Sequence, residues 1–192
     1  PIHYCGNPCD MDRLIKMSEK NDFKIIEDAA HALGTIYDGK LVGGFGDVTC
    51  FSFDGIKNIT SGEGGCIVSD DEEFLNIISD IRLLGVEKDT ERRFSGNRSW
   101  EFDVFRQGWR YHMSNIMAAI GLEQLKRFPE FARKRREHAK LYDSIFNDHE
   151  RIKPLIRDYD YVVPHIYVIC IEKLWNRKVI QKKLLELGLK VP

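Results

Sequence analysis

The stretch GGFGDVTCFSFDGIKNITSGEGGCIVS, residues 43–69, decides the fold, because it holds two short β-branched runs between glycine-rich turns. Apolar runs of this length that are bounded by glycine clusters are typical of strands. We therefore expect strands at residues 48–53 and 66–69, and a third strand upstream at residues 24–28. Strands followed by helices indicate an α/β or α+β fold, and an open sheet of this kind binds ligands at the carboxyl ends of its strands.

The remainder of the chain is mostly helical in pattern. Pro129 suits the first turn of a helix, where a missing N–H costs nothing, so we expect a new helix to begin there. Residues 85–107 show no clear period, and a loop of that length is usually functional or disordered. The other expected elements are helices at 10–20, 70–81, 113–128, 129–146 and 176–187, and a strand at 162–171 interrupted by Pro164.

The charge balance excludes several classes of protein. The chain has 29 Lys and Arg against 30 Asp and Glu, for a net charge of −1, so we expect no nucleic-acid partner. It has no apolar stretch of the roughly 18 residues that cross a bilayer, so we expect no membrane association. The dense charge run at residues 130–140 is most simply the solvated face of a helix.

The five cysteines are an odd number and contain no CxxC pair or zinc-like spacing. We expect reduced thiols in a cytoplasmic protein, and no metal site. Cys50 and Cys66 lie in apolar runs, which predicts core positions. The chain does not begin with Met and has no signal-peptide pattern, so we expect it to be an internal piece of a longer protein.

Three polar residues lie where this fold would place chemistry. Asp28 and Ser52 stand at or near the ends of two expected strands, and Lys57 lies between the second strand and a glycine-rich turn. Pyridoxal phosphate needs such a set: an amine for its aldehyde, a carboxylate for its ring nitrogen, and a hydroxyl with backbone N–H groups for its phosphate. Taken singly, each residue also fits an ordinary structural role, as a cap, a turn or a surface lysine, and His31 alone fits a structural histidine.

Four segments in order resemble the DegT/StrS-type nucleotide-sugar aminotransferases, which are pyridoxal-phosphate enzymes of fold-type I. They are EDAAHALG at 27–34, GGFGDVTCFSF at 43–53, GIKNITSGEGG at 55–65 and GWRYHMSNIMAAIGLEQL at 108–125. Further matches are weaker: residues 3–11, the pair Lys88-Asp89, and residues 100–104. The resemblance implies an α/β, aspartate-aminotransferase-like large domain over residues 1–128. Residues 129–192 would then be a linking helix and the start of a small C-terminal α/β domain.

The resemblance also implies roles for individual residues. Lys57 would bind the cofactor's aldehyde and act as the catalytic base, and Asp28 would pair with the pyridinium nitrogen. His31 would lie near the ring hydroxyl, and Ser52 would bind the phosphate. Arg110 stands where the family often has Asn, a residue that reaches the phosphate in the neighbouring subunit, so a homodimer is expected.

The implied reaction moves an amino group from glutamate to a keto group of a nucleotide-linked deoxysugar, for polysaccharide, lipopolysaccharide O-antigen or glycoside biosynthesis. Two alternatives stay open within the same fold. One is a pyridoxal- or pyridoxamine-dependent sugar dehydratase, against which Lys57 argues, because that branch has His in its place. The other is a catalytically inactive fragment that acts as a binding or regulatory module, since the family's N-terminal phosphate loop is not recognisable here. An unrelated α/β protein is the remaining alternative.

Overall fold

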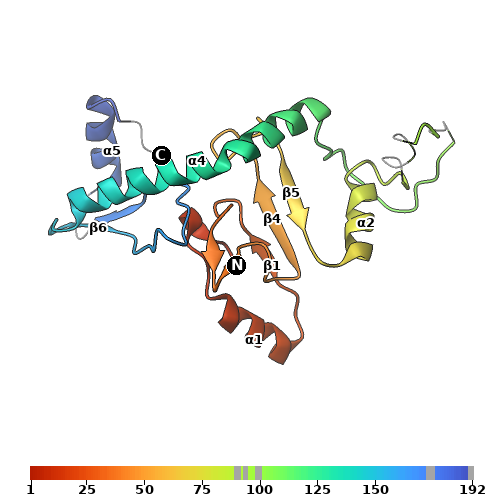
Figure 1. Cartoon of the computed structure of the whole chain (residues 1–192), viewed down its shortest axis with the longest axis horizontal. Helices are drawn as coiled ribbons and strands as arrows, with labels where there is room; N and C mark the ends of the chain where they lie inside the picture. The colour runs from red at the N-terminus through yellow and green to blue at the C-terminus, as the bar shows by residue number, and fades with distance from the viewer. Residues whose placement is uncertain (89–91, 93–94, 98–100, 172–175, 190–192) are drawn as a thin grey trace.

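A computed structural model describes the chain except for residues 89–91, 93–94, 98–100, 172–175 and 190–192 (Figure 1). Its centre is a three-stranded sheet in the order β1-β4-β5. The strands are β1 (Ile26–Asp28), β4 (Val48–Ser52) and β5 (Gly65–Val68), close to the three expected runs. β1 and β4 are parallel, with Asp28 opposite Cys50, whereas β4 and β5 are antiparallel, with Ser52 opposite Gly65.

The expectation that both strand cysteines belong to the core is wrong for Cys66. All four residues of β5 are exposed, Cys66 among them, and Cys50 on the central strand is half-buried. β5 is the edge strand of this sheet, and within the described residues its side chains are not covered by another layer. An apolar run therefore predicted the strand correctly but not its burial. None of the five cysteines forms a disulfide.

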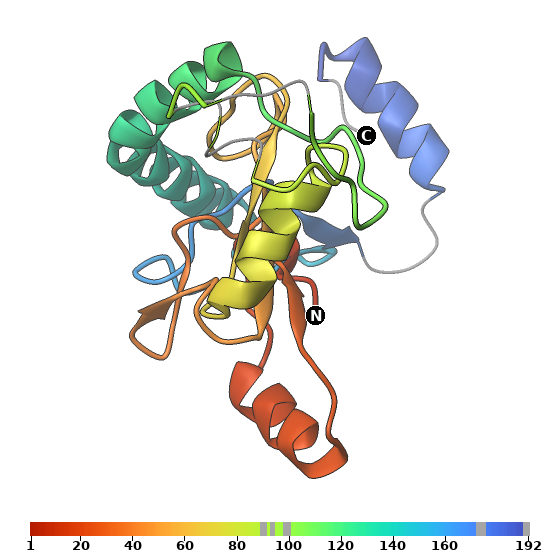
Figure 2. The same ribbon diagram turned by 90° about the vertical axis from the view of Figure 1, so that its right-hand side faces the viewer.

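The first two expected helices each begin with a side-chain cap. α1 (Met11–Asn21) follows Asp10, whose carboxylate accepts a hydrogen bond from the Arg13 N–H. α2 (Glu72–Ile81) follows Asp71, which caps the Phe74 N–H in the same way. Such caps satisfy N–H groups that lack a partner inside the helix. Figure 2 shows α1 at one end of the sheet, with α4 at the opposite end.

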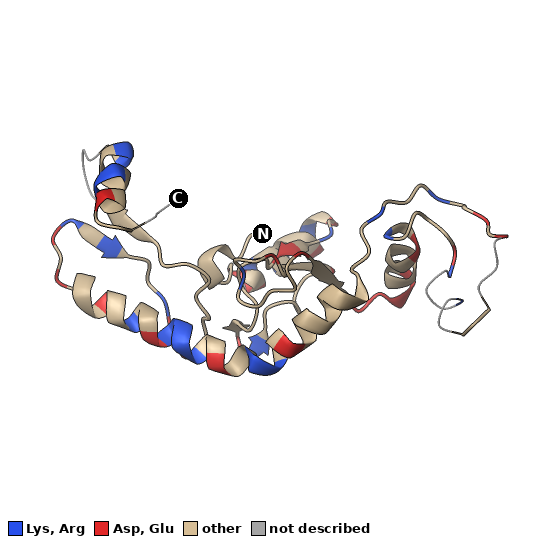
Figure 3. Cartoon of the chain, turned by 90° about the horizontal axis from the view of Figure 1, so that it is seen from above, with Lys and Arg blue, Asp and Glu red and all other residues tan. Residues whose placement is uncertain are grey.

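The two helices expected on either side of Pro129 are one continuous helix, α4 (Asn115–Phe146), so that expectation is wrong. Proline inside a helix removes one N–H and bends the axis, but it does not have to end the helix. Figure 3 shows α4 curving along its length. Ala132 and Ala139 are buried on its inner side, and the Phe128 ring packs against Gly34. Contacts before and after Pro129 thus hold both halves of α4 against the rest of the chain.

The expected strand at 162–171 is also wrong over most of its length. Only β7 (Ile169–Ile171) is a strand, and it pairs antiparallel with β6 (Ile152–Pro154). Pro164 has no N–H for a ladder. The residues on either side bond elsewhere: the Val163 N–H donates to Thr35 Oγ1 at 3.0 Å, and the His165 N–H to the Cys5 carbonyl at 3.3 Å.

The remaining elements are short. The hairpin of β2 (Ile36–Tyr37) and β3 (Lys40–Leu41) was not expected, although its loop, Asp38-Gly39, with φ of 44° and 75°, is a common two-residue turn. A 3-10 turn, η1, spans Tyr4–Gly6. The last helix, α5 (Arg177–Glu186), follows the capping residue Asn176 as expected. Among the described residues no helix is long and apolar enough to span a bilayer.

Candidate active site

The predicted site residues Asp28 and Ser52 lie at the same edge of the sheet. β1 and β4 run parallel, so their carboxyl ends meet there, and the β4 arrow points toward α4 (Figure 1). The Asp28 side chain is exposed, and its Oδ1 accepts a hydrogen bond from the Ala30 N–H at 3.0 Å. Ser52 Oγ accepts the Asp54 N–H at 3.4 Å. The structure therefore places a carboxylate and a hydroxyl on neighbouring strands at the edge where this class of sheet binds ligands.

Lys57 lies in the turn that leaves this edge. Its N–H donates to the Asp54 carbonyl at 3.0 Å, and the turn returns to the sheet through a bridge between Asp54 and Gly62. Gly65 begins β5 so close to β4 that a Cβ there would lie 2.5 Å from the Phe51 carbonyl oxygen. The glycines that end the turn thus allow the close return that keeps Lys57 beside the strand ends.

The charges of Lys57 and Asp28 act on the pKa of His31 in opposite directions. Burial, followed by the positive charge of Lys57, lowers its pKa below 6.5, while the negative charge of Asp28 acts in the opposite direction. The Cys5 N–H donates to His31 Nδ1 at 3.5 Å, which leaves the proton of the neutral ring on Nε2. Asp28 and Lys57 thus both lie within electrostatic range of the His31 ring.

A fourth member of this cluster, His165, was missed by sequence reasoning. Its ring centroid lies 4.2 Å from that of His31, at an interplanar angle of 33°. Burial, with the charges of His31, Lys57 and Arg135, lowers its pKa to about 4, so the imidazole is neutral near pH 7. Its Nδ1 is buried without a hydrogen-bond partner in the described structure. In the sequence, His165 lies within the apolar run 162–171, which predicts a strand, and no neighbouring residue indicates a functional histidine.

Arg110 is not part of this cluster. Its backbone bridges to Leu83, just after α2, and its side chain is exposed. Within the described part of the chain, the Arg110 side chain has no hydrogen bond or ion pair to Lys57, Asp28, His31 or Ser52. Its predicted contact with a neighbouring subunit remains a prediction. The expected pair Lys88-Asp89 lies partly outside the described residues, as does the segment 100–104.

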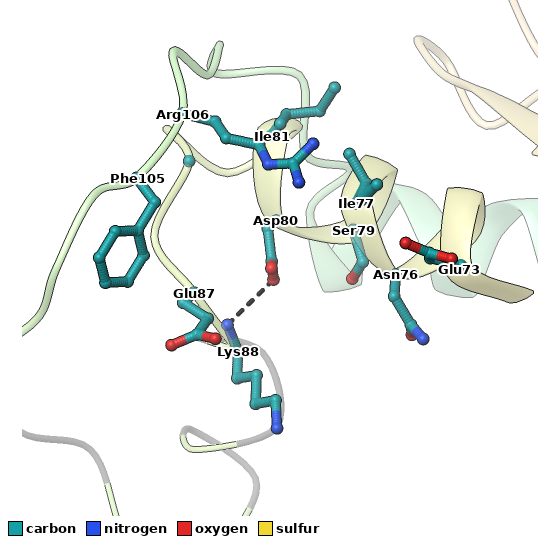
Figure 4. Close-up of a pocket in the computed structure, with 11 residues that line it drawn as sticks. Glu73, Asn76, Ile77, Ser79, Asp80, Ile81, Glu87, Lys88, Phe105 and Arg106 are labelled. Carbon is teal, nitrogen blue, oxygen red and sulfur yellow. Dashed lines mark hydrogen bonds between the residues drawn. The ribbon is translucent and has the colours of Figure 1, made fainter.

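A cavity of about 710 Å³ lies away from the cluster, between α2 and the loop that follows it. Figure 4 shows the Asp80 carboxylate pointing toward the Lys88 backbone, whose N–H donates to Asp80 Oδ1 at 2.9 Å. None of the residues predicted for the active site lines this cavity. The cluster around Lys57 is therefore separate from this cavity.

Comparisons with known proteins show which proteins this chain is similar to. An uncharacterized protein of Methanocaldococcus jannaschii is 44% identical over 173 residues, which is 89% of this chain and 45% of that protein. The UDP-4-amino-4,6-dideoxy-N-acetyl-beta-L-altrosamine transaminase of Campylobacter jejuni is 33% identical over 193 residues, 99% of this chain and 49% of that protein. The chain thus spans about half the length of these curated relatives.

Solved structures show the same likeness. Helicobacter pylori PseC, an aminotransferase of pseudoaminic acid biosynthesis, matches with a TM-score of 0.85 and 32% identity over 97% of this chain and 49% of that one. The PMP form of the putative sugar aminotransferase Spr1654 from Streptococcus pneumoniae matches with a TM-score of 0.86 and 32% identity, over 99% of this chain and 53% of that one. The family profile described as the DegT/DnrJ/EryC1/StrS aminotransferase family matches residues 1–191, and the chain belongs to this family.

Proposed function

We propose that this chain provides the lysine-bearing part of a pyridoxal-phosphate-dependent aminotransferase that acts on a nucleotide-linked keto sugar. One observation carries the proposal: Lys57 lies close enough to His31 and His165 to lower the pKa of both, at the strand ends that hold Asp28 and Ser52. Residues from four separate segments meet there.

The groups present fit pyridoxal phosphate. The cofactor needs one amine, one carboxylate and a hydroxyl with nearby N–H groups, and the edge offers Lys57, Asp28 and Ser52 for these three roles. The unpartnered Nδ1 of His165 leaves a polar atom available to a bound molecule. A solved relative is described in its PMP form, which supports a B6 cofactor here.

Each residue of the proposed site would have a separate role in the reaction. When bound, pyridoxal phosphate supplies a ring that takes up negative charge from the amino-acid α-carbon. Asp28 would hold the ring nitrogen in its protonated form, and Ser52 would accept or donate hydrogen bonds at the phosphate. Lys57 Nζ would bind the aldehyde at rest and, once released, would take the α-proton of glutamate and pass it to the cofactor. His31 and His165, both neutral, add no positive charge beside that amine.

The substrate class follows from the relatives. The Campylobacter and Helicobacter proteins are named for nitrogen-containing sugars, so we place a nucleotide-linked deoxysugar with a keto group as acceptor and glutamate as donor. The proposal includes a homodimer in which Arg110 reaches the partner's site, and a boundary between residues 1–128 and 129–192. It also includes a cytoplasmic location, which the five free cysteines favour.

The dehydratase and the inactive-module alternatives make different predictions from the aminotransferase. The test is to incubate the pyridoxal-phosphate-loaded protein with glutamate and follow the cofactor's absorbance, then add a UDP-linked 4-keto-6-deoxy sugar. An aminotransferase converts the cofactor to its amine form with glutamate and then forms the 4-amino sugar. A dehydratase releases a deoxygenated sugar instead, and an inactive module changes neither. Either of these last outcomes contradicts the proposal.

A further inference from the structure

Arg135 stands out because it lies in the charge run expected to be a solvated face, yet it points inward. It is half-buried, and burial lowers its pKa below the ordinary value for arginine. Its neighbours behave as expected for surface residues: Arg133 pairs with Glu137 and Lys134 with Glu130, with more than half of each basic side chain exposed, at 59% and 53%. The expectation of a solvated face therefore holds for part of the run and fails for Arg135.

The guanidinium of Arg135 joins two segments far apart in the sequence. Its Nη1 donates to the His165 carbonyl oxygen at 2.8 Å, and its Nη2 donates to the Lys57 carbonyl oxygen at 3.3 Å. No carboxylate pairs with it within the described part of the chain. A half-buried guanidinium is costly to keep without partners, and here the partners are the backbone dipoles of two site residues.

The backbones of Lys57 and His165 are each held by two hydrogen bonds, one at the N–H and one at the carbonyl. The Lys57 N–H donates to the Asp54 carbonyl, and its own carbonyl is fixed by Arg135. The His165 N–H donates to the Cys5 carbonyl, and its carbonyl is fixed by the same guanidinium. Fixing the backbone on both sides limits the directions that a side chain can take. The rigid, planar Arg135 guanidinium therefore fixes the positions of Lys57 and His165 relative to each other.

The inner side of α4 is built to allow this contact. The only fully buried residues of the helix are Ala132 and Ala139, which flank the arginine by one turn on each side. Their small side chains let the helix lie near the sheet edge, so that the guanidinium reaches across. Arg136, the next residue, donates from Nε to the Val162 carbonyl at 3.1 Å and holds the same segment a few residues earlier.

We infer that Arg135 is a positioning residue, which fixes the backbones of Lys57 and His165 relative to each other so that the lysine amine stays beside the imidazoles. The inference rests on the proposed function for the role of Lys57, but the contact itself does not. In the structure the Arg135 guanidinium contacts the carbonyl groups of Lys57 and His165. Its effect passes through the two carbonyl groups alone.

The first test measures amide hydrogen exchange in cofactor-free protein. In Arg135→Gln, exchange of peptides covering residues 54–59 and 162–167 is expected to accelerate together by about tenfold, because both lose a charge-assisted hydrogen bond. Arg133→Gln, a surface change on the same helix, is the matched control and leaves both peptides as in the parent protein. Unchanged exchange in Arg135→Gln, or an equal rise in distant α1, overturns the inference.

The second test asks whether the contact matters for chemistry. Arg135→Gln is expected to lower kcat of the glutamate reaction by about tenfold or more while KM changes less than about twofold, since a small misplacement of a reacting group costs rate rather than binding. Arg135→Lys keeps the charge but not the fork, and it recovers only part of the rate. It also serves as the folded variant if Arg135→Gln fails to fold. Equal rates in all three proteins overturn the inference, whereas a parent protein with no reaction counts against the proposed function and leaves the exchange test to decide.

Discussion

His3 Nε2 lies 2.8 Å from Glu27 Oε2, and both side chains are completely inaccessible to solvent. The Cys9 N–H donates to His3 Nδ1, so the neutral ring carries its proton on Nε2 and donates it to the carboxylate. The other Glu27 oxygen accepts the Gly46 N–H and the Thr49 hydroxyl. A buried carboxylate next to Asp28 thus ties the N-terminal segment and the glycine-rich turn to the strand that ends in the site.

Replacing this carboxylate is expected to weaken the fold. Glu27→Gln keeps the shape but removes the charge shared by four donors: His3, the Phe45 and Gly46 N–H groups, and the Thr49 hydroxyl. We therefore expect a loss of about 3 kcal/mol in the free energy of unfolding. Urea denaturation measures it. The control is Glu130→Gln on α4, where an exposed ion pair with Lys134 is lost and less than about 0.5 kcal/mol is expected. Equal losses in the two variants would contradict the role of Glu27.

Glu27 also predicts acid sensitivity. Burial alone would raise its pKa, but hydrogen bonds from His3, Gly46 and Thr49 outweigh that and lower the pKa below 4.5. A lowered pKa in the fold stabilises the protein at pH values above 4.5, and this stabilisation is lost as the pH falls through the folded value. In Glu27→Gln, this part of the pH dependence should be absent. A parent and variant with parallel stability curves below pH 4.5 would refute the assignment.

The lowered pKa of His165 predicts a second range, at higher pH, in which the stability of the fold depends on pH. Its pKa falls from 6.5 to about 4 in the fold, so between these values the unfolded chain binds a proton that the folded chain does not. Stability is therefore full above pH 6.5 and declines by about 3 kcal/mol as the pH falls to 4. His165→Gln should flatten this slope, whereas His138→Gln, an exposed change on α4, should not. Thermal unfolding across that range decides between them.

The contact between α4 and the site segment gives a packing prediction. Gly34 has φ of 79°, and a Cβ there would lie 2.2 Å from the Phe128 ring. Gly34→Ala is expected to cost about 3 kcal/mol or more, since both the backbone and the ring must shift. Gly39→Ala, at φ of 75° in open space, pays only the backbone strain of about 1 kcal/mol. Chemical denaturation of both variants tests whether the ring contact, and not the backbone angle, dominates.

Much of the fold could be predicted from local sequence. Helices formed close to the expected ranges 10–20, 70–81 and 176–187, and the β-branched runs became strands, because both depend on a few adjacent residues. Asp10, Asp71 and Asn176 cap these helices. Pro129 and Pro164 misled in opposite ways. The first was expected to begin a helix that in fact runs through it, and the second to lie within a strand that its surroundings do not form. What decided both cases was packing against distant residues.

The site shows the same division. Lys57, Asp28 and Ser52 could be proposed because they follow strands within one stretch of the chain. His165 and Arg135 could not, because an apolar run hid the first and a charge run hid the second. Their roles arise only when α4 and the segment after it fold back over the sheet edge. No local sequence pattern predicts that the Arg135 guanidinium donates hydrogen bonds to the carbonyl groups of Lys57 and His165.

Asp28 has a separable role in the proposed chemistry. Asp28→Asn should still allow pyridoxal phosphate to attach at Lys57, but it should slow the glutamate reaction by about a hundredfold, because a neutral partner does not keep the ring nitrogen protonated. Asp38→Asn, in the exposed hairpin turn, is the control and should react as the parent protein does. Stopped-flow absorbance after mixing with glutamate separates the two effects. An unchanged rate in Asp28→Asn would remove Asp28 from the site.

Reduction of the pyridoxal-phosphate-treated protein with borohydride, followed by peptide mapping, tests the assignment of Lys57 most directly. Attachment at a site lysine gives one reduced adduct, on the peptide that contains Lys57, and none in Lys57→Arg. We expect this single adduct, and we expect glutamate added before borohydride to prevent it. Adducts spread over exposed lysines such as Lys24 and Lys126, with Lys57 unmodified, would contradict the proposal that this edge of the sheet binds the cofactor.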